Sequence, residues 1–302
     1  MSDIALTPDP RPLGKSGIAV SPIAWGMWRF AGRPQGEARA LVDAALSAGI
    51  TLFDTADIYG FDGEGGFGGA ELLLGELFAA DPTLRGRMVL ATKGGITPPV
   101  PYDSGRDYLM QALDDSLRRL RVDQVDLYQI HRPDILTHPH EVARTLDAMI
   151  ASGKVRSVGV SNHSPDQTRT LARYLDAPIV SQQPEFSPLF TDPMTNGLFD
   201  QAMEHDIAVL AWSPLGGGRI AEPGTAQEHA VAAALDAVAA QFRVSRTSAA
   251  YAWIMAHPAR PIPIVGTQNA TRIAEVADVY KVRWTRAAWY EVLVAARGEK
   301  LP

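Results

Sequence analysis

The feature that most constrains the fold of this chain is a short apolar run that recurs eight times, with a helical pattern between successive runs. The runs are rich in β-branched residues and cover residues 23–26, 51–55, 88–92, 125–130, 155–160, 179–182, 208–212 and 262–265. Continuous apolar runs of this length are typical of parallel strands that are covered on both faces. Eight of them in 302 residues predict an α/β fold, a (β/α)8 TIM barrel.

Helical patterns fill the intervals between these strands and continue past the last one. The predicted helices are 37–48, 69–79, 106–120, 140–151, 165–174, 195–205, 227–242, 246–256, 269–280 and 286–296. The last two predict extra C-terminal helices, and a turn at residues 15–17 predicts a short N-terminal hairpin. Residues 1–12 are polar and Pro-rich, as in a loose tail or a strap. Because no stretch resembles a linker, we expect residues 1–302 to form a single domain.

An open, doubly wound sheet is the competing architecture, and it needs a glycine fingerprint after its first strand. The turn there reads GMWRFAGRPQGE, which does not fit. The segment GEGGFG at 63–68 matches G-x-G-x-x-G literally, but it begins several residues beyond a strand end and no acidic strand end follows at the right distance. We therefore expect 63–69 to be a flexible loop at the rim of the barrel.

Composition excludes several classes of function. A net charge of −6 argues against nucleic acid as a partner, and the absence of cysteine excludes thiol nucleophiles, disulfides and Cys-based zinc sites. Neither a signal peptide nor an apolar segment of membrane-spanning length is evident, so we expect a cytoplasmic protein with no membrane partner. Nothing in the sequence demands more than a monomer or a weak oligomer.

Four polar residues stand at the ends of three consecutive strands. Asp54 ends the second strand and Tyr59 follows it, while Lys93 and His131 come at the ends of the third and fourth strands. Catalytic residues of such barrels collect at the carboxyl ends of the strands. Each residue alone has an ordinary structural explanation, but four at adjacent strand ends predict one site.

The chemistry of these four side chains suggests a proton donor. A phenol with a pKa near 10 is a weak acid, and a neighbouring Lys93 ammonium is expected to lower that pKa. Asp54 would pair with Lys93, and His131 would bond the oxygen that is being protonated. Tyr59 would then act as a general acid beside a carbonyl group. Asp57 has no role in this scheme, and we expect it to be a cap or loop residue.

Motifs along the whole chain resemble those of the aldo-keto reductases, in order and at fitting spacing. They are FDTADIYG, GGAELLLGELF, ATKGG, LYQIHRPD, GKVRSVGVSNHS, SQQPEFSPL, LAWSPLGGGR and IPIVGTQNATRIAEV. Within that family the chain looks most similar to the bacterial YdhF-like oxidoreductases. The resemblance implies a catalytic tetrad of Asp54, Tyr59, Lys93 and His131, and reduction of aldehydes or ketones to alcohols with NADPH.

The same resemblance implies a set of cofactor-binding positions. The residues that match them are Gly26, Met27, Trp28, Ser161, Asn162, Gln183, Trp212, Ser213, Leu215, Gly216, Gly266, Thr267, Gln268, Arg272 and Glu275. In the family's pattern Ser161, Asn162 and Gln183 bind the nicotinamide carboxamide, and Trp212 stands where an aromatic ring stacks on the nicotinamide. Arg272 matches the arginine that contacts the 2′-phosphate, so NADPH is expected over NADH, beside a helix N-terminus near residue 269.

Two other functions stay open at this point. Lys93 could form a Schiff base with substrate in a lyase, or the chain could be a nucleotide-binding redox sensor with little turnover. No metal site is expected, because His131, His138 and His140 have no accompanying carboxylate cluster. The small-molecule carbonyl substrate is undefined, and aromatic residues expected to wall its pocket are Trp28, Phe61, Phe67, Phe186, Trp284 and Trp289.

Overall fold

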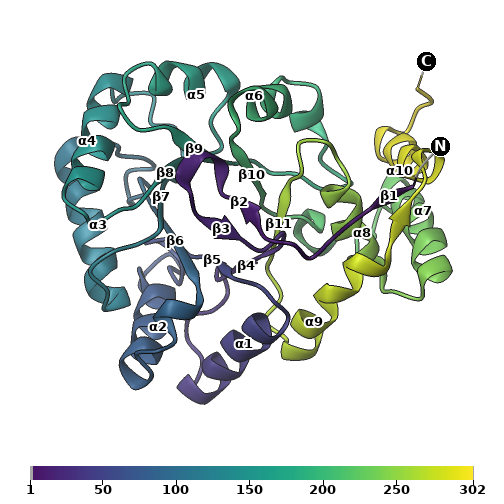
Figure 1. Cartoon of the computed structure of the whole chain (residues 1–302), viewed down its shortest axis with the longest axis horizontal. Helices are drawn as coiled ribbons and strands as arrows, with labels where there is room; N and C mark the ends of the chain where they lie inside the picture. The colour runs from purple at the N-terminus through teal and green to yellow at the C-terminus, as the bar shows by residue number, and fades with distance from the viewer. Residues whose placement is uncertain (1–2, 302) are drawn as a thin grey trace.

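The computed structural model describes residues 3–301 and contains a closed barrel of eight strands (Figure 1). The strands are β4 (Ala24–Gly26), β5 (Leu52–Asp54), β6 (Val89–Gly94), β7 (Leu127–Ile130), β8 (Val158–Ser161), β9 (Ile179–Gln183), β10 (Ala208–Ala211) and β11 (Ile262–Val265). Each is parallel to the next along the chain, and β11 pairs with β4 to close the barrel. The predicted (β/α)8 barrel is confirmed.

Helices surround the barrel and follow the predicted alternation (Figure 1). They are α1 (Gln35–Ser47), α2 (Gly69–Ala80), α3 (Arg106–Leu120), α4 (Pro139–Ala151), α5 (Pro165–Ala172), α6 (Leu198–His205), α7 (Ala226–Phe242), α8 (Arg246–Met255), α9 (Ala270–Ala274) and α10 (Arg286–Arg297). Figure 1 shows α7, α8 and α10 grouped at one side of the barrel. No helix within residues 3–301 is both long and apolar enough to cross a membrane.

The predicted N-terminal hairpin closes the amino end of the barrel. Its strands are β2 (Arg11–Pro12) and β3 (Ala19–Val20), which pair antiparallel. Gly14 in the turn has φ +53°, and a Cβ there would lie 2.3 Å from the Val180 carbonyl oxygen, so only glycine lets the hairpin approach β9 this closely. The apolar plug beneath it consists of Leu13, Ile18, Val20, Ala24, Leu52, Ala91, Leu127, Val180, Leu210, Ile262 and Ile264.

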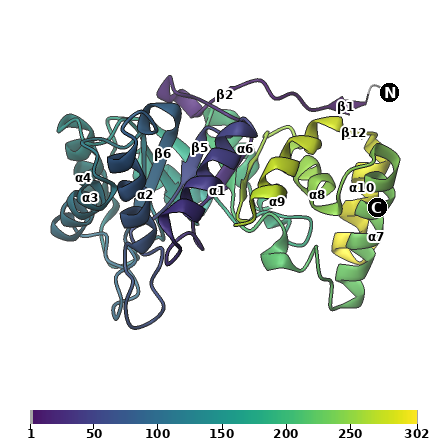
Figure 2. The ribbon, with the colours of Figure 1, turned by 90° about the horizontal axis from the view of Figure 1, so that it is seen from below.

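The segment that begins at residue 3 forms a strap. Strand β1 (Ile4–Ala5) pairs antiparallel with β12 (Arg283–Trp284), which precedes α10. Figure 2 shows this strap running along the same face as β2. The segment therefore ties the two ends of the described chain together.

Two predicted helices differ in the structure: one is interrupted and one begins later than expected. The segment 269–280 contains α9 followed by a 3-10 helix, η5 (Glu275–Lys281), and its buried residues Ile273, Val276, Val279 and Val282 recur every third position. A spacing of three matches the 3-10 helix, in which side chains at i and i+3 eclipse. Helix α6 begins at Leu198 instead of residue 195, because Gly197 adopts φ +86° and precedes the first helical turn.

Candidate active site

The four residues predicted to converge do meet at the carboxyl ends of the strands. Asp54 is the last residue of β5, Lys93 lies in β6, and His131 directly follows β7. Tyr59 lies in the turn after β5, its hydroxyl bonded to Lys93 Nζ and its ring centroid 5.8 Å from that of His131. Pairing of β5 with β6 and of β6 with β7 brings these positions side by side.

Lys93 is the centre of the cluster. Its side chain is fully buried, and its ammonium nitrogen donates to Asp54 Oδ2 at 2.7 Å, the Thr55 carbonyl oxygen at 2.9 Å and the Tyr59 hydroxyl at 3.1 Å. An ammonium has three N–H donors, so these acceptors use all of them. The three hydrogen bonds hold the Lys93 ammonium in place next to the Tyr59 hydroxyl.

Burial and neighbouring charges oppose each other at both Lys93 and Tyr59. Burial alone lowers the pKa of Lys93, but Asp54 and Tyr59 favour the ammonium and the pKa is raised overall. For Tyr59, burial raises the pKa, Lys93 lowers it, and the net direction is upward. Lys93 does lower the pKa of Tyr59, as expected, but desolvation outweighs the ammonium, so the expected net fall of that pKa is wrong.

His131 is neutral in this setting. Burial lowers its pKa well below the usual value, and the positive charges of Lys93 and Arg132 act in the same direction. Its backbone N–H donates to the Gly94 carbonyl, while its Nδ1 is buried without a hydrogen-bond partner. A neutral imidazole at this position has one N–H to donate, beside the Tyr59 ring.

Four of the predicted cofactor residues form a connected group next to the tetrad. Asn162 donates to Ser161 Oγ at 2.8 Å and accepts from the Trp212 indole N–H at 2.9 Å. Ser161 Oγ in turn donates to the Gln183 backbone carbonyl at 2.9 Å. The amide of Gln183 is turned inward and donates to Asp54 Oδ1 at 2.9 Å. This last contact was not anticipated from the sequence.

Backbone strain marks the same end of the barrel. Asn162 and Ser213, which follow β8 and β10, have φ values of +57° and +52°. Left-handed conformations in non-glycine residues away from helix ends are uncommon and gather at functional sites. Beyond Ser213 the 3-10 turn η4 (Gly216–Gly218) consists of three glycines, and all three have positive φ. Because glycine has no side chain, a phosphate could approach this backbone closely.

The segment after β11 is placed beside β4. Trp25 donates its indole N–H to the Thr267 carbonyl at 3.0 Å, and Gln268 donates to the Gly26 carbonyl at 3.1 Å. The expected helix near residue 269 is the short α9, and Asn269 caps it by accepting from the Arg272 N–H, so this donor of the first turn is already used. Arg272 and Glu275 are exposed.

The predicted aromatic wall is only partly correct. Trp28 is 56% exposed and packs edge-on against Tyr59 at 5.1 Å between centroids. With Phe61 and the glycines of the loop after β5 it lines a hollow beside the tetrad. The other aromatic residues expected there, apart from Phe67, pack in the core: Phe186, Trp284 and Trp289. Met27 is also fully buried, so its side chain does not face the hollow.

Two polar residues were missed or misjudged. Arg132 lies 5.6 Å from the centroid of the Trp212 ring and makes no ion pair within residues 3–301. Its place in the motif IHRPD, directly after His131, was the available signal. Asp57 lies in the turn after β5, as expected of a loop residue, but its burial was missed: its side chain is fully buried, 3.5 Å from the Tyr108 hydroxyl, and burial raises its pKa well above the usual range.

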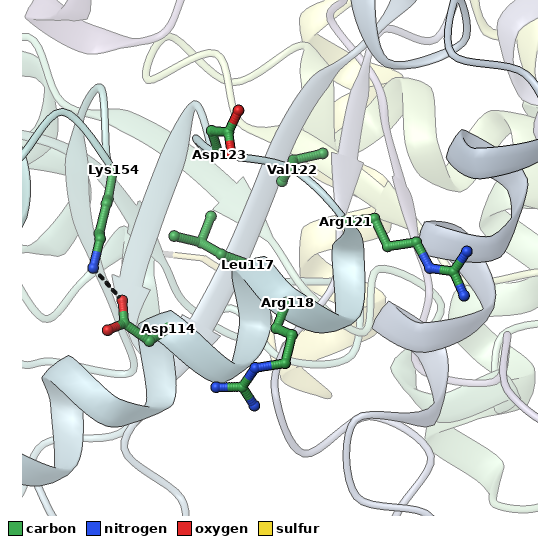
Figure 3. A pocket seen from close by; sticks show the side chains of 7 residues that line it. All are labelled: Asp114, Leu117, Arg118, Arg121, Val122, Asp123 and Lys154. Carbon is green, nitrogen blue, oxygen red and sulfur yellow. Dashed lines mark hydrogen bonds and ion pairs between the residues drawn. The ribbon is translucent and has the colours of Figure 1, made fainter.

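A second hollow lies near the opposite end of the barrel and lacks comparable chemistry (Figure 3). It is lined by the end of α3, the segment that leads into β7, and Lys154 before β8. Figure 3 shows Lys154 directed at Asp114, while Arg121 points away from that pair. Its charged side chains are partly exposed, so their ion pairs are weakened by solvent screening.

Comparison with known proteins agrees with the geometry. The sequence profile of the Aldo/keto reductase family matches residues 22–292. The chain is 62% identical over 304 aligned positions to the 6-dehydroglucose reductase of Novosphingobium aromaticivorans, with 100% of both chains covered. It is 32% identical to the oxidoreductase YdhF of Escherichia coli, over 96% of this chain and 98% of that one.

Among solved structures, the glycerol dehydrogenase of Gluconobacter oxydans superposes with a TM-score of 0.84 at 26% identity, over 98% of each chain. Carbonyl reduction with a nicotinamide cofactor is the general activity of the family that the profile describes. The chain is therefore an oxidoreductase that belongs to the aldo/keto reductase family.

Proposed function

We propose that this protein is an NADPH-dependent reductase of a hydroxylated aldehyde, with Tyr59 as the proton donor. The observation that carries the proposal is the Tyr59 hydroxyl, held 3.1 Å from a fully coordinated Lys93 ammonium and beside a neutral His131. A phenol in this position can donate a proton at neutral pH only if the phenolate left behind is stabilised, and the adjacent ammonium does that.

Each residue of the tetrad has one task in this scheme. Tyr59 gives its proton to the carbonyl oxygen and recovers one from solvent after the product leaves. Lys93 compensates the phenolate, and Asp54 holds Lys93 in place. His131 donates its single N–H to the same carbonyl oxygen and orients the substrate. When bound, NADPH supplies the hydride that the carbonyl carbon accepts.

The chain's own residues fit a nicotinamide dinucleotide. Ser161, Asn162 and Gln183 would hold the carboxamide, and the Trp212 ring, fixed by its bond to Asn162, would support the nicotinamide. The remaining cofactor residues would bind along the pyrophosphate and adenosine: Ser213, Leu215, Gly216, Gly266, Thr267, Gln268, Arg272 and Glu275. The exposed Arg272 guanidinium favours the 2′-phosphate of NADPH, so a lower KM for NADH than for NADPH would contradict this preference.

A hydroxylated substrate is favoured by Arg132. Arg132 directly follows His131, its guanidinium lies 5.6 Å from the centroid of the Trp212 ring, and no carboxylate within residues 3–301 forms an ion pair with it. Five N–H donors in a fixed plane suit substrate hydroxyl oxygens. The relative that is 62% identical is named for 6-dehydroglucose, a sugar aldehyde, which matches this chemistry.

The test compares two six-carbon aldehydes. With NADPH, we expect kcat/KM for 6-dehydroglucose to exceed that for hexanal by about 100-fold or more, since sites that bond hydroxyls reject analogues without them. In Arg132→Met we expect at least a tenfold loss for the sugar aldehyde and little change for hexanal, as for the loss of a single charged hydrogen bond. Equal rates with both aldehydes in the unaltered protein would overturn the substrate assignment.

A further inference from the structure

Gln183 makes a hydrogen bond that crosses the barrel. It is the last residue of β9, its side chain is 2% exposed, and its amide nitrogen donates to Asp54 Oδ1 at 2.9 Å. In the barrel order, β9 lies four strands from β5 in either direction, so the two residues come from opposite walls. Neighbouring strands bring the tetrad together, whereas this contact joins the tetrad to the far side.

The bond completes the coordination of Asp54. One carboxylate oxygen accepts from Lys93 at 2.7 Å and the other from Gln183. Because a carboxylate can only accept, the amide nitrogen of Gln183 has to face it. Two donors on opposite sides fix the plane of the carboxylate. Without Gln183, Oδ1 would be a buried carboxylate oxygen with no donor, and Asp54 could rotate to share Lys93 between both oxygens.

Rotation of the Asp54 carboxylate would change the position of the Lys93 ammonium and so its hydrogen bond to Tyr59. All three N–H donors of Lys93 are committed, and the bond to Tyr59, at 3.1 Å, is the longest of the three. A shift of the carboxylate therefore draws the ammonium away from the phenol first. Gln183 itself is held from behind, because its backbone carbonyl accepts from Ser161 Oγ at 2.9 Å and from the Asn162 N–H at 3.0 Å.

We propose that Gln183 is a positioning residue for the proton donor: through Asp54 it fixes the Lys93 ammonium against the Tyr59 hydroxyl. The proposal deepens the function proposed above and rests on it for its effect on turnover. It adds a task to the cofactor contact expected of Gln183, since the bond to Asp54 is made within the protein itself. Gln183, Asp54, Lys93 and Tyr59 then form a hydrogen-bonded chain of four residues whose first member lies across the barrel.

The test uses the cofactor-free protein first. Tyrosine labelled with 13C at Cζ is titrated by NMR, and the Tyr59 signal is identified by its loss in Tyr59→Phe. In Gln183→Leu we expect the pKa of Tyr59 to rise by about one unit, because a loosened ammonium stabilises the phenolate less. The charged or titratable groups that face Tyr59 are Lys93, Asp54, His131 and Arg132, and none of them is altered.

The matched control is Gln182→Leu on the same strand. Gln182 is equally buried, but its amide donates to the His163 carbonyl and to Thr168 in α5, outside the barrel. This variant should leave the Tyr59 titration unchanged. A second variant, Gln183→Glu, separates a positioning role from a folding defect. Its new carboxylic acid can donate to Asp54 only while protonated, so turnover should recover as the pH falls and decline as that proton is lost.

Turnover supplies the second readout. In Gln183→Leu we expect kcat to fall about 10- to 100-fold, the scale of a misplaced catalytic group. An unchanged Tyr59 titration in Gln183→Leu, together with weaker NADPH binding, would overturn the proposal and leave Gln183 as a cofactor contact alone. If the unaltered protein reduced no carbonyl, the proposed function would fail, while the NMR titration would still decide the role of Gln183.

Discussion

The two ends of this barrel are built from the same strands but carry opposite chemistry. At the amino end, the apolar plug under the β2–β3 hairpin contains no titratable side chain. Two residues further along the strands, the interior carries Asp54, Lys93 and Gln129 where the plug has Leu52, Ala91 and Leu127. Side chains two residues apart on a strand point to the same side, so these are successive interior layers.

The difference shows how the molecule separates stability from function. The apolar layer removes hydrocarbon from water and has no polar group to satisfy. The polar layer buries a lysine completely, which is costly unless the charge is paired, and Asp54 pairs it at 2.7 Å. We therefore expect substitutions in the polar layer to change chemistry and pH response, and substitutions in the apolar layer to change stability alone.

The largest expected effect is that of Tyr59→Phe. The variant keeps the ring and loses only the hydroxyl, so kcat for carbonyl reduction should fall by a factor of about 100 to 10,000, the usual contribution of general acid catalysis. The dissociation constant for NADPH, measured by quenching of protein fluorescence, should change less than about twofold, because no binding contact is removed. Turnover close to that of the unaltered protein would remove Tyr59 from the mechanism.

Next is the buried ion pair. Lys93→Met leaves the Asp54 carboxylate without its cation, and we expect a loss of about 3–5 kcal/mol in the free energy of unfolding. The double variant Asp54→Asn with Lys93→Met removes both charges and keeps an acceptor for Gln183. Urea titration should show its stability within about 1.5 kcal/mol of the unaltered protein, although it is inactive. Equal instability of the single and double variants would contradict a charge-based cause.

Leu127→Ala tests the apolar layer. Leu127 is fully buried in β7, and its truncation should lower the free energy of unfolding by about 2–5 kcal/mol through lost burial and a residual cavity. At 25 °C, kcat and KM should stay within about twofold, because the tetrad lies in the next layer. A large fall in kcat with normal stability would show that the two layers are not separate in the way described.

A smaller effect on the free energy of unfolding is expected when the pH is lowered, because of His163 at the carboxyl end of the barrel. His163 follows β8, is 7% exposed, and burial lowers its pKa to about 4. Between pH 6.5 and 4 the unfolded chain therefore binds more protons than the folded one, so stability falls as the pH falls. When the pH is lowered from 6.5 to 4, the free energy of unfolding should fall in both proteins, but by about 3 kcal/mol less in His163→Gln than in the unaltered protein. Parallel stability curves for the two proteins would contradict this assignment.

Most of the barrel could be predicted from the sequence, because each strand is a continuous apolar run with its own helix after it. The pairing of β1 with β12 could not, since Ile4 and Trp284 are 280 residues apart by their numbering and short edge strands leave no periodic signal. The break between α9 and η5 could not be predicted either, because apolar residues spaced three apart are also found on one face of an α-helix.

The candidate site divides in the same way. Residues at the ends of adjacent strands, such as Asp54 and Lys93, could be brought together from chain order alone. The Gln183 bond could not be predicted, because which side chain reaches across a barrel depends on the interior packing. The pKa of Tyr59 was expected to fall on the basis of one neighbour, whereas its net direction depends on burial, which a sequence does not give.

The central claim is that the carboxyl end of the barrel carries hydride transfer to a carbonyl carbon with protonation by Tyr59. The most direct measurement follows the label from NADPH dideuterated at C4 during reduction of 6-dehydroglucose, with mass spectrometry of the alcohol. We predict one deuterium on the former carbonyl carbon in the unaltered protein, and scarcely any product from Tyr59→Phe. An alcohol formed at the normal rate without deuterium, or equally by Tyr59→Phe, would contradict the account.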